Sequence, residues 1–148
     1  MRVLFLDIDG VLDSVRSAVA LDKYPHNLSR RSLKKFDWVA IGLVRKLCAE
    51  CNVEIVLSSV WRHGFSCEDM SKALQLPIKY KTGTTRAGVR GVEIQEWLNS
   101  HPEVENYAIV DDDSDMLGTQ KPHFVQTSFE DGLSYNNYLQ LKKIFSQH

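Results

Sequence analysis

The sequence predicts an α/β fold in which one parallel sheet lies between two layers of helices. Three observations predict it: short, fully apolar runs, helical patterns between them, and polar clusters directly after the runs. Strands of a parallel sheet are buried on both faces and therefore read as continuous apolar stretches. Their alternation with helices favours right-handed crossovers that cover both faces of the sheet. The expected fold is thus a three-layer sandwich with a Rossmann-like sheet.

The expected elements follow from apolar runs and helical periodicity. The strands are expected at residues 3–6, 53–57, 107–110 and 124–125. The helices are expected at residues 41–51, 68–76, 92–99 and 138–145. No repeat and no shift of composition divides the chain, so we expect one domain over residues 1–148.

One segment, residues 14–36, matches none of these elements. It directly follows the first strand, where a compact domain normally uses a short loop. Two interpretations are open: a flap or small cap over the functional site, and a mobile surface loop. The segment is basic, and its cations are Arg16, Lys23, Arg30, Arg31, Lys34 and Lys35. These cations could attract a nucleic-acid backbone, or Arg30, Arg31, Lys34 and Lys35 could simply form the solvated face of a short helix.

The composition indicates a soluble globular protein. The chain has 148 residues, 43% of them hydrophobic and 25% charged, and its net charge of −1 creates no overall attraction to nucleic acid or membrane. No apolar stretch approaches the roughly 20 residues of a membrane span, and the N-terminus does not read as a signal peptide. We therefore expect a cytoplasmic protein without membrane contact.

The cysteines predict core packing rather than a disulfide or a metal site. There are three, an odd number, which argues against a disulfide framework. Cys48 and Cys51 form a CxxC, but no second pair follows and both continue the apolar face of the expected 41–51 helix. Free cysteine behaves as a small buried hydrophobe.

Acidic clusters follow two of the expected strands. Asp7 and Asp9 end the first, and Asp111, Asp112 and Asp113 end the third. Functional groups in an open α/β sheet gather beyond the carboxyl ends of the strands, so these clusters should meet at one edge. A single acidic pair often serves as a cap or turn. Two clusters of like charge instead require a cation, and Mg²⁺ suits a site of few carboxylates.

The spacing within the first cluster permits a division of labour. Asp7 and Asp9 are two residues apart and would point to the same face of an extended backbone. Gly10 then allows a sharp turn. Asp7 could attack phosphorus as a nucleophile, while Asp9 protonates the leaving oxygen and later deprotonates water.

These motifs resemble the haloacid dehalogenase (HAD) superfamily of phosphohydrolases. The string LDIDGVL matches its first motif, DxDGxL, and Ser58 in IVLSSVWR and the cluster AIVDDDSD follow in the family's order. More narrowly, LSSxWR, RGxEIxxWL, VDDDSDM and VQTxFExGL resemble the small HAD domains associated with RNA-repair polypeptides. The resemblance runs from residue 1 to about residue 133.

The resemblance implies a role for each motif residue. Asp7 is the nucleophile and a Mg²⁺ ligand, and Asp9 is the general acid/base that also offers its carbonyl to the metal. Asp111 and Asp112 complete the metal site, with Asp115 just outside it. Ser58 hydrogen-bonds the phosphoryl group, with the Ser59 amide beside it. Apart from the resemblance, Arg62 follows Ser58 closely enough to reach the phosphate, and Gly10 is a further expected substrate contact. The implied reaction is phosphomonoester hydrolysis through an aspartyl-phosphate, with nucleotide or polynucleotide-end phosphates among the expected substrates.

The sequence departs from the family at the third motif, which is usually a lysine. Arg90 opens the expected 92–99 helix instead and would add its positive field and a bidentate grip on phosphate. Lys81 and Arg86 are rivals for this position. Trp61 is interpreted as a core residue and His63 as a surface residue.

Three other functions are open at this point. The chain could hydrolyse a small phosphometabolite, or it could bind metal and phosphate without turnover. A phosphotransferase or dehalogenase could use the same scaffold, although dehalogenases of the family do not use the second aspartate, which is present here as Asp9.

Overall fold

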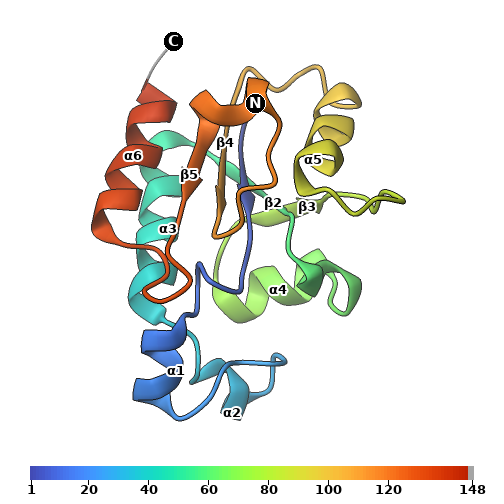
Figure 1. Ribbon diagram of the computed structural model, residues 1–148. Helices are drawn as coiled ribbons and strands as arrows, with labels where there is room; N and C mark the ends of the chain where they lie inside the picture. The colour runs from blue at the N-terminus through green and yellow to red at the C-terminus, as the bar shows by residue number, and fades with distance from the viewer. Residues whose placement is uncertain (147–148) are drawn as a thin grey trace.

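A computed structural model describes residues 1–146 of the chain. Five strands form one parallel sheet in the order β3-β2-β1-β4-β5 (Figure 1). The strands are β1 (Arg2–Leu6), β2 (Glu54–Leu57), β3 (Ile78–Lys81), β4 (Asn106–Asp111) and β5 (Phe124–Gln126). The predicted α/β fold with a Rossmann-like parallel sheet is confirmed. The strand order reverses between β1 and β4, which is where open α/β sheets bind ligands.

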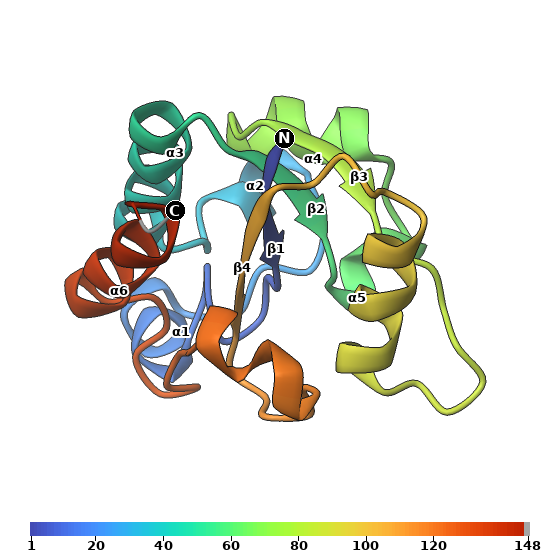
Figure 2. The same cartoon turned by 90° about the horizontal axis from the view of Figure 1, so that it is seen from above.

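Helices cover both faces of the sheet. They are α1 (Val15–Leu21), α2 (Arg30–Leu33), α3 (Trp38–Cys51), α4 (Cys67–Leu74), α5 (Arg90–Asn99) and α6 (Tyr135–Ser146), with 3₁₀ turns η1 (Val60–His63) and η2 (Gly118–His123). Figure 2 shows α3 and α6 on one side of the central strands and α5 on the other. None of the helices within residues 1–146 has the length and apolar character to cross a membrane.

Alternation along β1 divides the core into two layers. Leu4 and Leu6 pack in the cluster that contains α3, α4 and α6. Val3 and Phe5 pack in the cluster that contains α5. There the rings of Phe5 and Trp97 form an edge-to-face pair with centroids 5.5 Å apart. Because β1 is fully buried on both faces, its carboxyl end is held rigidly in the centre of the sheet.

The structure corrects the expected elements in two places. Strand β3 was not expected, because it pairs only with β2 and exposes Lys79 and Lys81, so its sequence is not an apolar run. The expected 68–76 helix ends at Leu74, because Gln75 adopts a left-handed backbone conformation with φ of 55°. The other expected strands and helices are present, with bounds shifted by a few residues.

The 14–36 segment is folded. Ser14 caps α1 in a reciprocal capping box with Ser17, and Ser29 caps α2. The Val15 amide donates to the Phe129 carbonyl at 3.2 Å, and Phe36 is buried in the core. The two short helices lie beyond the carboxyl ends of the strands, and α1 lies next to the loop between β5 and α6 (Figure 1). A role as a flap stays a prediction.

The cysteines pack as predicted. Cys48 is buried in the core and Cys51 and Cys67 are half-buried, all three as free thiols. Burial raises the pKa of Cys48 to about 12, which keeps this thiol protonated and unreactive.

Candidate active site

Two adjacent strands bring the acidic clusters together. Leu6 of β1 lies opposite Val110 of β4, and the Asp7 amide donates to the Val110 carbonyl at 3.1 Å. The next residue of each strand is therefore an aspartate at the same edge. One oxygen from each of Asp7, Asp111 and Asp112 lies within 4.8 Å of the others. The predicted convergence of the two clusters is present.

Burial makes this carboxylate cluster costly to ionise. Asp7 and Asp111 are both buried. Loss of solvation and the neighbouring charge of Asp111 raise the pKa of Asp7 to about 9, against the lowering effect of Arg90. Burial also raises the pKa of Asp111. The full charge of the cluster at neutral pH therefore requires a cation.

The cluster fits a hard divalent cation. Asp111 Oδ2 is buried and accepts no hydrogen bond, its nearest cation being Arg90 Nε at 3.9 Å, while Asp111 Oδ1 accepts the Asp113 amide at 3.0 Å. Gly10 makes room for Asp112, because a Cβ on Gly10 would lie 2.4 Å from Asp112 Oδ2. Carboxylate oxygens with an unpaired buried member are the donor set that Mg²⁺ takes.

Asp9 points to a different set of partners. Trp61 Nε1 donates to Asp9 Oδ2 at 3.2 Å. Asp13, fully buried, accepts the Gly10 amide at 3.0 Å. Burial, followed by hydrogen bonding with Asp9, raises the pKa of Asp13 to about 8. The Asp9 carboxyl thus accepts a hydrogen bond from Trp61 and lies beside Asp13, while the Asp7 carboxyl lies in the carboxylate cluster with Asp111 and Asp112.

Trp61 combines packing with this contact. Its ring packs on Phe36 and Phe65, with centroids 5.5 and 5.3 Å away, so the predicted core role is confirmed. The hydrogen bond to Asp9 was not foreseen, because a single tryptophan between core and site gives no sequence signal for its Nε1 direction.

Several buried donors near this edge lack hydrogen-bond partners: Ser58 Oγ, Arg90 Nη1 and the hydroxyls of Thr82 and Thr85. Ser58 Oγ is buried and unpaired, and the Ser58 amide donates to the Leu6 carbonyl beside Asp7. Arg90 Nη1 is also buried and unpaired, while its Nε lies 3.9 Å from Asp111 Oδ2. Buried donors without a partner cost free energy, and Ser58 and Arg90 are the two next to Asp7 and Asp111, so their free N–H and O–H groups are available to an anionic ligand.

The loop after β4 fixes Arg90 in place. Asp115 Oδ2 accepts the Arg90 amide at 3.0 Å, and the Asp115 carbonyl accepts the Gly91 amide. Gly91 permits this approach, because a Cβ there would lie 2.7 Å from the Leu117 nitrogen. The Asp115 carboxylate faces the first turn of α5 and offsets its positive end.

The structure separates Arg90 from its rivals. Lys81 is exposed and donates to the Arg62 carbonyl at 3.3 Å. Arg86 is exposed in the loop that precedes α5. Among the three, Arg90 is the cation that pairs with Asp111.

Arg62 is fully occupied by the protein. Its guanidinium donates to the carbonyls of Ser58, Ser59, Thr82 and Gly83 and to Glu93 Oε1. These five bonds use all five of its N–H groups. The expected contact with a phosphoryl group stays a prediction, and this arrangement favours a positioning role for Arg62.

Sequence reasoning missed two buried acids. Asp13 follows the buried pair Val11 and Leu12, and the third aspartate of DIDGVLD was its only signal. Glu93 is paired with Arg62 at 3.2 Å and accepts the Thr85 amide at 2.9 Å. Glu93 is the glutamate of the RGxEIxxWL motif, but this motif does not reveal that its partner is Arg62. His63 is exposed, as predicted, and Ser59 Oγ accepts the Trp61 amide.

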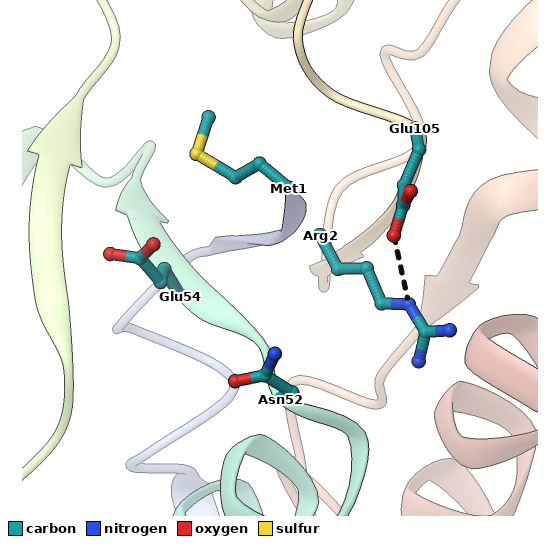
Figure 3. A pocket seen from close by; sticks show the side chains of 5 residues that line it. All are labelled: Met1, Arg2, Asn52, Glu54 and Glu105. Carbon is teal, nitrogen blue, oxygen red and sulfur yellow. Dashed lines mark ion pairs between the residues drawn. The ribbon is translucent and has the colours of Figure 1, made fainter.

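A pocket of about 370 Å³ lies at the opposite end of the sheet (Figure 3). Its lining residues are Met1, Arg2, Asn52, Glu54 and Glu105. Arg2 Nε forms an ion pair with Glu105 Oε1 at 3.5 Å, so the positive charge of Arg2 is neutralised within the pocket. The pocket lies at the amino ends of the strands and is separate from the carboxylate cluster.

Comparison with known proteins identifies the family. The family model for the HAD domain in Swiss Army Knife RNA repair proteins matches residues 3–138. No curated protein and no solved structure gives a significant match. HAD domains generally use Mg²⁺ and carry out phosphatase-type chemistry, in agreement with the acidic cluster. The chain belongs to the family of HAD domains found in Swiss Army Knife RNA repair proteins.

Proposed function

We propose that the chain is a Mg²⁺-dependent phosphomonoester hydrolase that acts through an aspartyl-phosphate on Asp7. One observation carries the proposal: three carboxylates and two unpaired buried donors converge at one sheet edge. The carboxylates suit a cation, and the donors of Ser58 and Arg90 suit the oxygens of a phosphoryl group.

The metal site would use Asp7, Asp111, Asp112 and the Asp9 carbonyl. When bound, Mg²⁺ neutralises phosphoryl oxygens that would otherwise repel the attacking carboxylate. Ser58 Oγ and Arg90 Nη1 would bind the same phosphoryl group from the protein side.

In the first step, a carboxylate oxygen of Asp7 forms a bond to phosphorus as the ester bond breaks. Asp9 donates its proton to the leaving oxygen, so the alcohol departs neutral. The contacts of Asp9 with Trp61 and Asp13 keep its carboxyl apart from the metal ligands. In the second step, Asp9 takes a proton from water, the water oxygen bonds to phosphorus, and the bond to Asp7 breaks.

The proposed substrate is a phosphate on a nucleotide or on the end of a polynucleotide. Support comes from the family description, which names RNA repair, and from the basic 14–36 segment at the same edge of the sheet. A small phosphometabolite is the alternative substrate. The alternative function is a module that binds metal and phosphate without turnover, which wild-type inactivity on p-nitrophenyl phosphate would indicate.

Replacement of Asp7 by Asn should abolish turnover, because the amide keeps the shape of the side chain and loses the nucleophile. Hydrolysis of p-nitrophenyl phosphate in Mg²⁺ should fall at least ~1000-fold, and EDTA should abolish wild-type activity. The matched control is Asp113→Asn, an exposed member of the same acidic run, which should stay near wild type. Substantial turnover by Asp7→Asn would exclude the covalent mechanism.

Replacement of Asp9 by Asn should slow poor leaving groups far more than good ones, because only poor ones need protonation. The ratio of kcat/KM for p-nitrophenyl phosphate to that for an alkyl phosphate should rise. Trp61→Phe keeps the aromatic packing and loses the hydrogen bond, so it should shift the same ratio by about tenfold or less. Equal losses on both esters would instead indicate a purely structural role for Asp9.

Replacement of Arg90 by Ala should lower kcat/KM on the order of 100-fold, as loss of one donor to the transition state does elsewhere. Lys81→Ala and Arg86→Ala should be close to wild type, since neither side chain approaches Asp111 in this structure. If Lys81→Ala or Arg86→Ala loses activity while Arg90→Ala stays active, the assignment of the third motif to Arg90 is wrong.

Stability without metal should fall as pH rises. The folded-state pKa values of Asp7, about 9, and Asp13, about 8, lie above the ordinary value of 3.8, so the folded chain holds more protons between these limits. Each group then removes up to about 1.4 kcal/mol of stability per pH unit in this window. Thermal melts in EDTA should give a lower Tm at pH 8 than at pH 6.

The same melts with Mg²⁺ separate the metal from the protons. Mg²⁺ should raise Tm more at pH 8 than at pH 6, because at pH 6 it must displace protons from the cluster. Asp7→Asn should flatten the pH dependence, and Asp131→Asn, an exposed control, should not. An equal gain from Mg²⁺ at both pH values would argue against metal binding by these carboxylates.

A further inference from the structure

We propose that a basic pocket in the 14–36 segment, together with the Tyr24–Phe129 aromatic pair, binds the single-stranded polynucleotide whose end phosphate enters the active site. This inference rests on the proposed function and names the surface that selects its substrate. The occupant is a single strand with an unpaired base next to the terminal phosphate.

The pocket has the size and charge for a nucleotide unit. Its volume is about 320 Å³, within the range of small-ligand sites. Its lining residues are Asp22, Lys23, Tyr24, His26, Ser29, Arg31, Ser32 and Lys35. Three of these are cations and one is a carboxylate, on a chain whose net charge is −1. The pocket is therefore a local attractor of anions rather than part of a generally basic surface.

The structure divides the cations of the segment. Lys23, Arg31 and Lys35 line this pocket, with Lys35 held by a hydrogen bond to the Leu21 carbonyl. Arg16 and Lys34 line a separate pocket with Trp38. Arg30, the neighbour of Arg31 on α2, lines neither of these two pockets. The solvated-face interpretation treats Arg30, Arg31, Lys34 and Lys35 alike, whereas the structure places them in different surroundings.

An aromatic platform adjoins the pocket. Tyr24 and Phe129 come from segments far apart in the sequence, and their rings stack at 6.5 Å between centroids with an interplanar angle of 23°. Both rings are open to solvent, with 41% and 51% of their surfaces exposed. Exposed aromatic rings beside basic side chains are the combination on which proteins stack the bases of single strands.

The platform lies close to the proposed reacting centre. Thr127 Oγ1 donates to the Gly10 carbonyl at 2.6 Å, and the Thr127 amide donates to the Asp111 carbonyl at 3.0 Å. Phe129 follows two residues later, a span of at most about 7 Å of chain. A terminal phosphate at Asp7 and the adjacent base on Phe129 and Tyr24 are therefore within the reach of one nucleotide or two.

The test compares a single-stranded, end-phosphorylated oligonucleotide with p-nitrophenyl phosphate in three variants. Arg31→Ala should lower kcat/KM on the oligonucleotide by about tenfold. It should also make the slope of log kcat/KM against log salt concentration shallower by about one, as loss of one phosphate contact does. Arg30→Ala, the matched control, should change neither. Tyr24→Leu should lower kcat/KM on the oligonucleotide about tenfold, because base stacking is lost, and should leave the salt slope unchanged. All three should hydrolyse p-nitrophenyl phosphate at the wild-type rate.

Binding to the inactive Asp7→Asn chain separates this inference from the proposed function. Fluorescence anisotropy with a labelled oligonucleotide should show the same ranking of Arg31→Ala, Tyr24→Leu and Arg30→Ala, each added to Asp7→Asn. A duplex of the same sequence should bind more weakly, because paired bases cannot stack on the platform. Absence of any phosphatase activity would overturn the proposed function while leaving this binding test intact. Equal effects of Arg30→Ala and Arg31→Ala, or equal binding of duplex and single strand, would overturn the inference.

Discussion

The pairing of β1 with β4 is the constraint on which the rest of the site depends. Leu6 of β1 pairs with Val110 of β4, and both are fully buried. Asp7 and Asp111 directly follow this pair, so they lie side by side where little water can solvate their charges. Buried like charges at this distance are unstable unless protons or a cation neutralise them. Gly10 leaves space for the Asp112 carboxylate, Thr127 binds the Gly10 turn, and Arg90 approaches from α5.

A second buried network holds the groups around this centre. Arg62 binds the carbonyls that follow β2 and β3, and its ion pair with Glu93 fastens both loops to α5. Both side chains are less than 5% exposed, so loss of either partner would leave a buried charge unpaired. The network therefore fixes the loop that carries Ser58 against α5, which carries Arg90, while Ser58 Oγ and Arg90 Nη1 make no hydrogen bond within the described residues.

Much of the fold was predictable because buried parallel strands leave an unmistakable apolar pattern. Strand β3 left none, since edge strands need no apolar face on both sides, and its lysines broke the run. The carboxylates of the site were predictable because motif residues at strand ends share an edge. The partners of those residues were not. The bond from Trp61 to Asp9, the place of Asp13 and the saturation of Arg62 depend on side-chain directions that residue spacing does not determine.

The positions of the charges also restrict how a polyanion can approach. Asp113 and Asp115 lie in the loop between β4 and η2, which passes next to the start of α5. Their carboxylates would repel a second phosphate that follows the one proposed to bind at Asp7. The basic insertion lies on the other side, below α3 and beside the β5–α6 loop (Figure 1). The cations Lys23, Arg31 and Lys35 lie on this second side together with the carboxylates of Asp22, Glu130 and Asp131. Under the proposed function, a polynucleotide end would run from Asp7 toward Tyr24 and Arg31, whereas a small phosphate ester would bring no second phosphate to either side.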